Sequence, residues 1–317
     1  MFIEKAYRAN HNFLLYLVGS VIIAIAATIG QMGLVAAILI QEGPEALMSL
    51  DENSMMTTLN ANLTLFLILI SFAFAIGGLI FCVKLIHDQK FKDIVTTRER
   101  FDWGRVFFGF GMIAVFSIAG TVLGYYLVPE DFVVNFNLEP FIILFLVTLI
   151  FMPIQTSAEE FIFRGYLMQG FGMLAKNRWF PLLMTSVIFG GMHYFNPEIG
   201  AMGDIVMVMY IGTGFLLGIM TLMDEGLELA LGFHAGNNMI AALLVTADWT
   251  VFKTDSILKD VSDPQADFID VAPVFIIYPI FLAILAYKYK WTGWKEKLFG
   301  TIDSPETTKK EDFFVAD

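Results

Sequence analysis

Ionisable side chains interrupt the apolar runs of this sequence at three places. The three segments are SAEEFIFRGYL (157–167), FGGMHYF (189–195) and GFHAGNNM (232–239). A charged side chain inside hydrocarbon is costly, so each one marks a functional site by default. The glutamates, histidines and asparagines of these segments are therefore the first candidates for chemistry.

The two adjacent glutamates differ in their helical surroundings. Glu160 precedes Arg164 by four residues, the spacing at which a glutamate and a cation meet on one helix face. Glu159 is rotated by about 100° and has no local cation. An unpaired carboxyl in apolar surroundings can exchange protons near neutral pH. Glu159 is the predicted proton-transferring group, although both glutamates could instead belong to a packing salt-bridge network with Arg164.

The two other segments repeat one helical spacing. His193 follows Phe189 by four residues, and Asn238 follows His234 by four. A lone buried histidine is more often a hydrogen-bonded core residue than a catalyst. Each of these helices must nevertheless bury a polar face, and one interior cavity would satisfy all of them together with Glu159.

The chemistry of such a cavity is limited by what the sequence lacks. It has no GxSxG, HExxH or Walker motif, and its single cysteine, Cys82, lies in an apolar run. A carboxylate and a histidine can deprotonate water, while a second histidine and an asparagine can stabilise an oxyanion. The same Glu159, His193 and His234 could instead hold one Zn²⁺. Both arrangements hydrolyse an amide.

The composition predicts the elements that must position these residues. Of 317 residues, 57% are apolar and 16% charged, against roughly 45–50% and 25% in soluble domains. We expect an all-α, polytopic membrane protein with about eight transmembrane helices and a conical interior cavity. The candidate spans are 13–40, 63–83, 106–128, 141–162, 181–193, 205–223, 229–247 and 272–287. The fifth is short and could be re-entrant.

The cations predict the orientation. With eight alternating spans and a cytoplasmic N-terminus, all of the 19 Lys and Arg residues except Lys253 and Lys259 fall on the inner side. Both termini are therefore expected in the cytoplasm. The net charge of −12 and the lack of a basic cluster argue against nucleic-acid partners. Residues 1–300 are expected to form one membrane domain, and 301–317 a polar, disordered tail.

The three motifs follow one another on neighbouring predicted spans. They are EExxxR from Glu159, FxxxH ending at His193 and HxxxN from His234. The ordered set resembles the signature of the CPBP family of intramembrane proteases. This family includes CAAX prenyl endopeptidases and Abi-like membrane proteins of bacteriocin processing or immunity. The resemblance covers residues 141–247, which would be the protease core.

This resemblance implies an endopeptidase with a cavity accessible from the cytosolic side. The catalytic residues that it implies are Glu159, His193, His234 and Asn238. The supporting residues that it implies are Glu160, Arg164 and Phe189. In this scheme Glu159 and His193 activate water, and the other two catalytic residues bind the oxyanion. We favour the metal-free mechanism without a cofactor, because a ligand set without a third imidazole or a cysteine makes only a moderate zinc site.

The expected partners are the lipid bilayer and a membrane-anchored protein or peptide substrate, which could be prenylated. The expected location is a prokaryotic plasma membrane. Two other functions use the same polar cavity: a non-enzymatic binding or immunity protein, and a proton-coupled transporter. Glutamate and histidine chains also serve as proton relays in transporters. Against a transporter, the halves of the sequence show no obvious two-fold relation.

Overall fold

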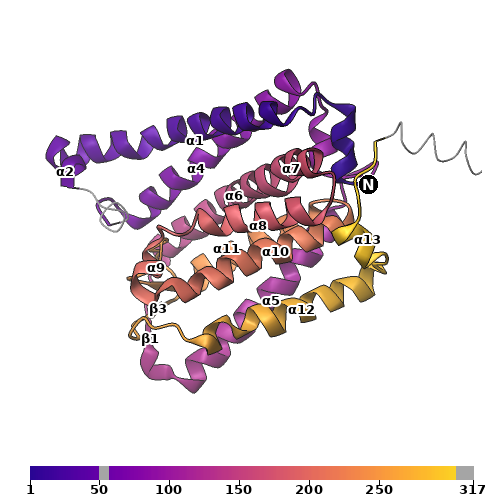
Figure 1. Cartoon of the computed structure of the whole chain (residues 1–317). Helices are drawn as coiled ribbons and strands as arrows, with labels where there is room; N and C mark the ends of the chain where they lie inside the picture. Colours follow the sequence, from indigo (N-terminus) through magenta and orange to yellow (C-terminus); the bar gives the residue numbers. More distant parts are fainter. Residues whose placement is uncertain (50–56, 305–317) are drawn as a thin grey trace, which may run out of the picture.

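The computed structural model of this chain describes residues 1–49 and 57–304, and it is mostly helical (Figure 1). The principal helices correspond to the eight predicted spans. They are α1 (Phe13–Glu42), α4 (Ala61–Phe81), α5 (Trp103–Leu127), α6 (Leu138–Glu160), α8 (Trp179–Gly191), α10 (Met207–Asp224), α11 (Glu228–Leu244) and α12 (Phe268–Tyr289).

Six helical stretches in the described residues are long and apolar enough to cross a membrane. They include α1, α5, α10, α12 and the extended forms of α4 and α6. The helices α8, with 13 residues, and α11, with 17, are shorter than these six. The chain is therefore a multi-pass integral membrane protein with six candidate spanning helices and two shorter helices, where we expected eight spans.

Short elements connect these helices. Before α5 they are η1 (Ile3–Arg8), α2 (Pro44–Ser49), the π-helical turn η2 (Cys82–Ile86) and η3 (Phe91–Ile94). After α5 they are η4 (Pro129–Asp131), β1 (Phe132–Val134), α9 (Pro197–Met202), η6 (Asp204–Val206), β2 (Val245–Ala247), β3 (Leu258–Asp260) and α13 (Trp294–Phe299). The expectation of a purely helical chain missed the small sheet. In it, β3 pairs antiparallel with β1 and parallel with β2.

The helix that carries Glu159 is longer than predicted. After α6, the chain continues without a break through the π-helical turn η5 (Phe161–Leu167) into α7 (Met168–Ala175), giving 38 helical residues. The helix runs beyond the predicted span 141–162, and eleven of its residues follow Arg164, about 16 Å of helix. Wide π-helical turns of this kind are frequent at functional sites.

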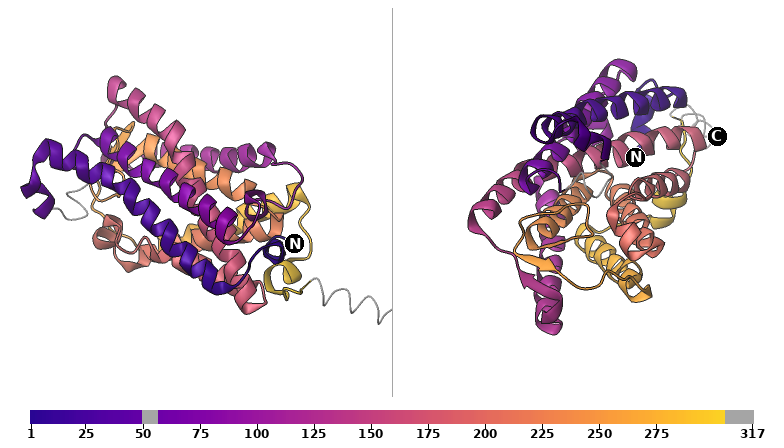
Figure 2. Two further views of the ribbon diagram at one scale, coloured as in Figure 1. Left: turned by 90° about the horizontal axis from the view of Figure 1, so that it is seen from above. Right: turned by 90° about the vertical axis from the view of Figure 1, so that its left-hand side faces the viewer.

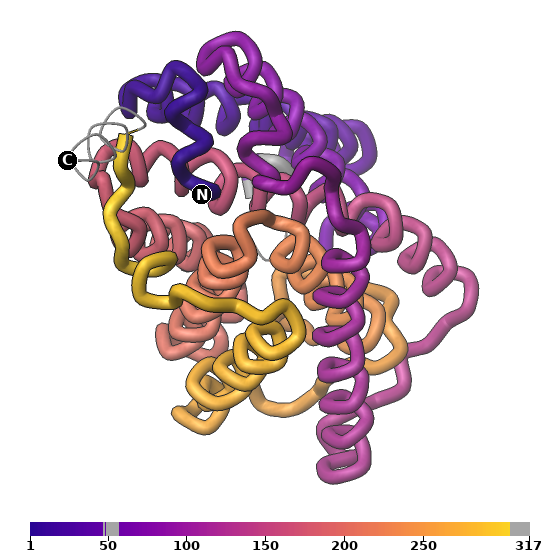
Figure 3. The backbone as a smooth tube through the Cα atoms, turned by 90° about the vertical axis from the view of Figure 1, so that its right-hand side faces the viewer, coloured from indigo at the N-terminus to yellow at the C-terminus, as the bar shows by residue number. Residues whose placement is uncertain are grey.

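The two ends of the helix bundle differ in the elements that they carry. Figure 1 shows α9, β1 and β3 at one end, and the N-terminus and α13 at the other; Figures 2 and 3 give the same arrangement from other sides. Ion pairs join the segments of the N-terminal end, such as Arg178 with Glu4 and Lys5 with Asp93. Ile302 is buried there and donates its N–H to the carbonyl of Lys176. The expected tail from 305 onward lies outside the described residues.

The site helix α11 packs closely along α5, and glycines permit this approach. A methyl group added at Gly232 would overlap the backbone of Val106, and one at Gly236 would press on Phe110. We expect Gly232→Ala to destabilise the protein by about 1–3 kcal/mol, the usual cost of overpacking. Gly120→Ala, at a position in α5 with nothing nearby, is the matched control. Thermal unfolding in detergent measures the difference, and equal midpoints for both variants would contradict this packing.

Candidate active site

The buried centre of the site is the ion pair expected from the sequence. Arg164 Nη1 donates to Glu160 Oε1 over 2.9 Å, and both side chains are fully buried. Nη2 donates to the carbonyl oxygen of Gly214 in α10 over 3.2 Å. The guanidinium also lies 4.2 Å from the ring centre of Phe189. Arg164 thus ties the long helix to α10 and to the aromatic residue of the second motif.

His234 lies between the two glutamates. Its Nδ1 is 2.8 Å from Glu160 Oε1, and its Nε2 is 3.5 Å from Glu159 Oε2. Because Glu160 Oε1 also accepts from Arg164, we take Nδ1 of His234 as the donor to this oxygen. Glu160 therefore sets the ring orientation that turns Nε2 toward Glu159.

Glu159 is the less constrained of the two carboxylates. Its side chain is 15% exposed, whereas that of Glu160 is 0% exposed. Within the described part of the chain, Glu159 Oε2 has no hydrogen-bond partner. Glu160 is paired with Arg164, as its spacing predicts. Glu159 has no cation of its own helix beside it, but its Oε2 atom lies within ion-pair distance of His234 Nε2.

His193 lies in the turn that follows α8, where Gly191 ends the helix. Its Nδ1 donates to the carbonyl oxygen of Phe189 over 2.8 Å, because a carbonyl can only accept. The imidazole stacks on Tyr210 of α10, with 4.3 Å between ring centres and 20° between planes. The ring of His193 is thus fixed from its backbone side and from one face.

Asn238 is held by amide contacts. Its Nδ2 donates to Gln155 Oε1 over 3.1 Å, and its Oδ1 accepts from Asn237 Nδ2 at the same distance. Gln155 is 4% exposed and lies one helical turn before Glu159. Polar contacts therefore join the long helix to α11 at Gln155, at Glu159 and at Glu160.

A pocket of about 290 Å³ brings three of the four predicted catalytic residues together. His193, His234 and Asn238 line it, along with residues of α9, α10 and the chain after β2. Glu159 is not among the lining residues, and it contacts the pocket through His234. Phe189 lines the pocket and separates the two histidines, its ring centre lying 5.0 Å from His193 and 5.8 Å from His234.

The described residues do not fit the three-ligand zinc site considered from the sequence. Among them, no three or more His, Cys, Asp or Glu side chains cluster closely enough to hold a metal ion. Glu159 and His234 are adjacent, but His193 stacks on Tyr210 instead of joining them.

Sequence reasoning missed three polar residues that support the site. Gln155 could have been found, because it precedes Glu159 by four residues inside an apolar span. Tyr210 and Glu198 gave no such signal. Tyr210 donates its hydroxyl to Glu198 Oε1 over 3.2 Å and accepts from Asn196 over 3.3 Å. Only the fold of α9 onto α10 brings this group beside His193.

The fold and the site together define a multi-pass helical membrane protein with a buried centre of glutamate, arginine and histidine. Residues 138–240 match the family described as Rce1-like, type II CAAX prenyl endopeptidase Rce1-like. This stretch of the chain is therefore a domain of that family, the CPBP group that the motifs resemble. It contains all three motifs.

One relative among curated proteins is similar over a longer stretch. It is described as uncharacterized protein YyaK of Bacillus subtilis (strain 168), and it is 34% identical over 189 residues. These residues are 59% of this chain and 63% of the relative, so the match spans less than two thirds of the relative's length. No solved structure gives a significant match.

Proposed function

We propose that this protein is an intramembrane endopeptidase that hydrolyses a peptide bond of a membrane-attached polypeptide. The observation that carries the proposal is the carboxylate of Glu159, which has a free oxygen 3.5 Å from the Nε2 atom of an oriented histidine. The family of residues 138–240 supports the same reaction class.

Glu159 is the general base of this mechanism. It takes a proton from the attacking water, whose oxygen then bonds to the carbonyl carbon of the substrate. His234 orients that water through Nε2, while Glu160 holds the opposite ring nitrogen. The pairing of Glu159 with His234 is favoured by their contact, whereas the sequence led us to expect a pair with His193.

The other two residues act on the substrate. Asn238 uses one amide hydrogen on Gln155 and has a second for the oxyanion that forms when the carbonyl is attacked. His193 lines the same pocket, and we assign it to the departing amine. When the carbon–nitrogen bond breaks, the proton taken by Glu159 passes to the amine nitrogen, leaving a carboxylic acid and a free amine.

The test uses the purified full-length protein in detergent with two peptides. One is a prenylated CaaX peptide, and the other is the same peptide without the prenyl group. Fragments detected by mass spectrometry, and lost in the Glu159→Ala variant, are expected for at least the prenylated peptide. Cleavage that Glu159→Ala does not affect would contradict the proposed site, and equal cleavage of both peptides would contradict a prenyl requirement.

Tyr210 is expected to position His193 without touching the reacting atoms. Replacing it by leucine removes a ring stack worth about 0.5–1.5 kcal/mol, so kcat should fall about 2- to 10-fold. Tyr210→Phe keeps the ring and should retain most of the activity. Steady-state kinetics across pH measure this, because a loosened His193 also shifts the pH profile.

An equal loss in both Tyr210 variants would contradict the stacking role and assign the effect to the hydroxyl. That hydroxyl is held by Glu198 and Asn196, so Glu198→Gln would then be expected to reproduce the loss.

A further inference from the structure

An oxyanion is stabilised by hydrogen-bond donors, and both ring nitrogens of His234 already face a glutamate. Its Nδ1 atom donates to Glu160, and its Nε2 atom lies 3.5 Å from Glu159 Oε2. In the neutral ring Nε2 carries no hydrogen, and in the charged ring its N–H faces the Glu159 carboxylate. The family resemblance implies that His234 and Asn238 bind the oxyanion together, but these contacts leave Asn238 without that partner.

The other side chains that line the pocket offer few free donors. Four of them bear an N–H or O–H group that is already in contact with another protein group: His193, Tyr210, Thr213 and Thr250. The hydrogen of the neutral His193 ring is on Nδ1, because this atom donates to a carbonyl oxygen. The amides of Asn237 and Asn238 are the remaining N–H groups among the lining side chains.

The two asparagines form a chain of three amides with Gln155. Asn237 Nδ2 lies 3.1 Å from Asn238 Oδ1, and Asn238 Nδ2 lies 3.1 Å from Gln155 Oε1. An asparagine amide carries two hydrogens, so this chain uses one of each asparagine. If all three amides are reversed, Asn237 becomes an acceptor and keeps both of its hydrogens. In either direction both asparagines keep at least one N–H for a ligand in the pocket.

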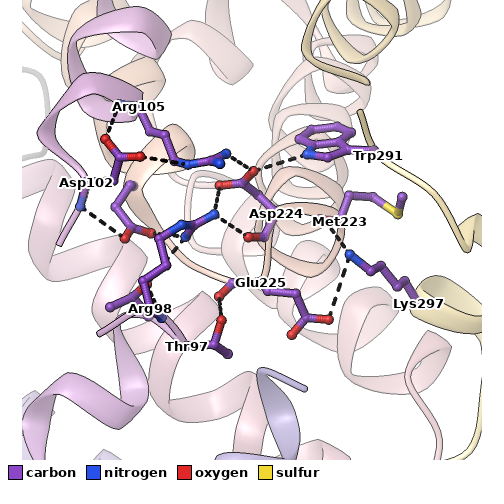
Figure 4. Close-up of polar contacts among 11 residues, drawn as sticks. Thr97, Arg98, Asp102, Arg105, Met223, Asp224, Glu225, Trp291 and Lys297 are labelled. Carbon is purple, nitrogen blue, oxygen red and sulfur yellow. Dashed lines mark hydrogen bonds and ion pairs between the residues drawn. The ribbon is translucent and has the colours of Figure 1, made fainter. Parts of the chain in front are cut away.

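The helix that carries both asparagines is fixed at its start. Arg98 donates to Glu228, the first residue of α11, over 2.9 Å, and the Glu228 side chain is fully buried. Figure 4 shows that Arg98 also contacts Asp224, over 2.8 Å, and that Trp291 donates to the same carboxylate. Asn237 follows Glu228 by nine residues, about 14 Å along this helix. Donors on a fixed element stabilise a developing charge without reorganisation.

We propose that Asn237 is a further catalytic residue, which binds the oxyanion together with Asn238. The inference rests on the proposed function and makes Asn237, in place of His234, the second donor. As the water oxygen bonds to the carbonyl carbon, the C=O electron pair moves onto the carbonyl oxygen, where the two free N–H groups bind it. The pair returns when the carbon–nitrogen bond breaks. Neither asparagine gains or loses a proton.

The test is steady-state cleavage of the prenylated CaaX peptide by the purified full-length protein in detergent. Asn237→Ala removes the donor, so kcat is expected to fall about 10²- to 10³-fold, the usual loss for one oxyanion donor. Asn237→Asp keeps the size of the side chain but replaces the donor by a carboxylate, and its kcat should be lower still. Asn10→Ala alters an exposed asparagine before α1 and should stay within a few-fold of the unaltered protein.

The order of the two variants separates catalysis from folding. A side chain with only a structural role would tolerate the nearly isosteric aspartate better than alanine. Asn237→Asp with a kcat within tenfold of the unaltered protein would overturn the proposal, and this variant decides the outcome if Asn237→Ala does not fold.

A second comparison separates donation by Asn237 from the positioning of Asn238. In an Asn238→Ala background, Asn237→Asp should lower kcat further, by at least about tenfold, and the lack of a further loss would overturn the proposal. Cleavage that is lost in Glu159→Ala but kept in both Asn237 variants would overturn this role and leave the endopeptidase standing. No cleavage by the unaltered protein would refute the endopeptidase, and this role with it.

Discussion

Glu159→Gln is expected to lower kcat by about 10²- to 10⁴-fold, the usual contribution of a general base. The amide keeps the size of the side chain and its place near His234 Nε2, but it cannot take the proton of the attacking water. KM should change little, because Glu159 is not among the residues that line the pocket. The measurement is steady-state cleavage by purified protein in detergent.

The matched control is the double variant Gln155→Glu with Glu159→Gln, which moves the carboxylate by one helical turn on the same helix. It should not restore activity, since position 155 contacts Asn238 and not His234. Activity of Glu159→Gln within a few-fold of the unaltered protein would remove Glu159 from the mechanism.

Arg164→Met is expected to destabilise the fold by about 3–5 kcal/mol, the cost of leaving a buried carboxylate without its cation. Glu160 is fully buried, and among the described residues only His234 is left as its partner in this variant. The side chain of Arg164 also supports Phe189 and the Gly214 carbonyl, so these contacts are lost together. Thermal unfolding in detergent and the yield of monodisperse protein measure the loss.

Two comparisons isolate the buried charge. Adding Glu160→Gln to Arg164→Met removes both charges and should recover part of the stability. Arg8→Met removes a cation whose side chain is 67% exposed and should cost less than about 1 kcal/mol. If Arg164→Met and Arg8→Met unfold at the same temperature, the buried pair does not stabilise the protein as argued.

The helical framework could be predicted from the sequence because the lengths of the apolar runs alone decide it. Each of the eight predicted spans corresponds to a helix, and the pairing of Glu160 with Arg164 follows from their spacing. The length of the helix beyond Arg164 could not be predicted, since the predicted span 141–162 ends before that cation. In the fold, α10 and Phe189 bury it instead.

The partners of the histidines were less accessible to sequence reasoning. Helical spacing relates residues on one helix, but Glu159 meets His234 across two helices that are 75 positions apart in the chain. The stack of His193 on Tyr210 likewise depends on the turn at Gly191 and on α9, which bring the start of α10 back to the end of α8. Such contacts require the tertiary fold.

The central claim is that Glu159 drives the hydrolysis of peptide bonds in membrane-attached polypeptides. Its most direct test compares new peptide termini in membranes of cells that express either the unaltered protein or Glu159→Gln at equal levels. Mass spectrometry should find termini in membrane-attached polypeptides that are formed with the unaltered protein and absent with Glu159→Gln. Identical sets of termini in the two membranes would contradict the account.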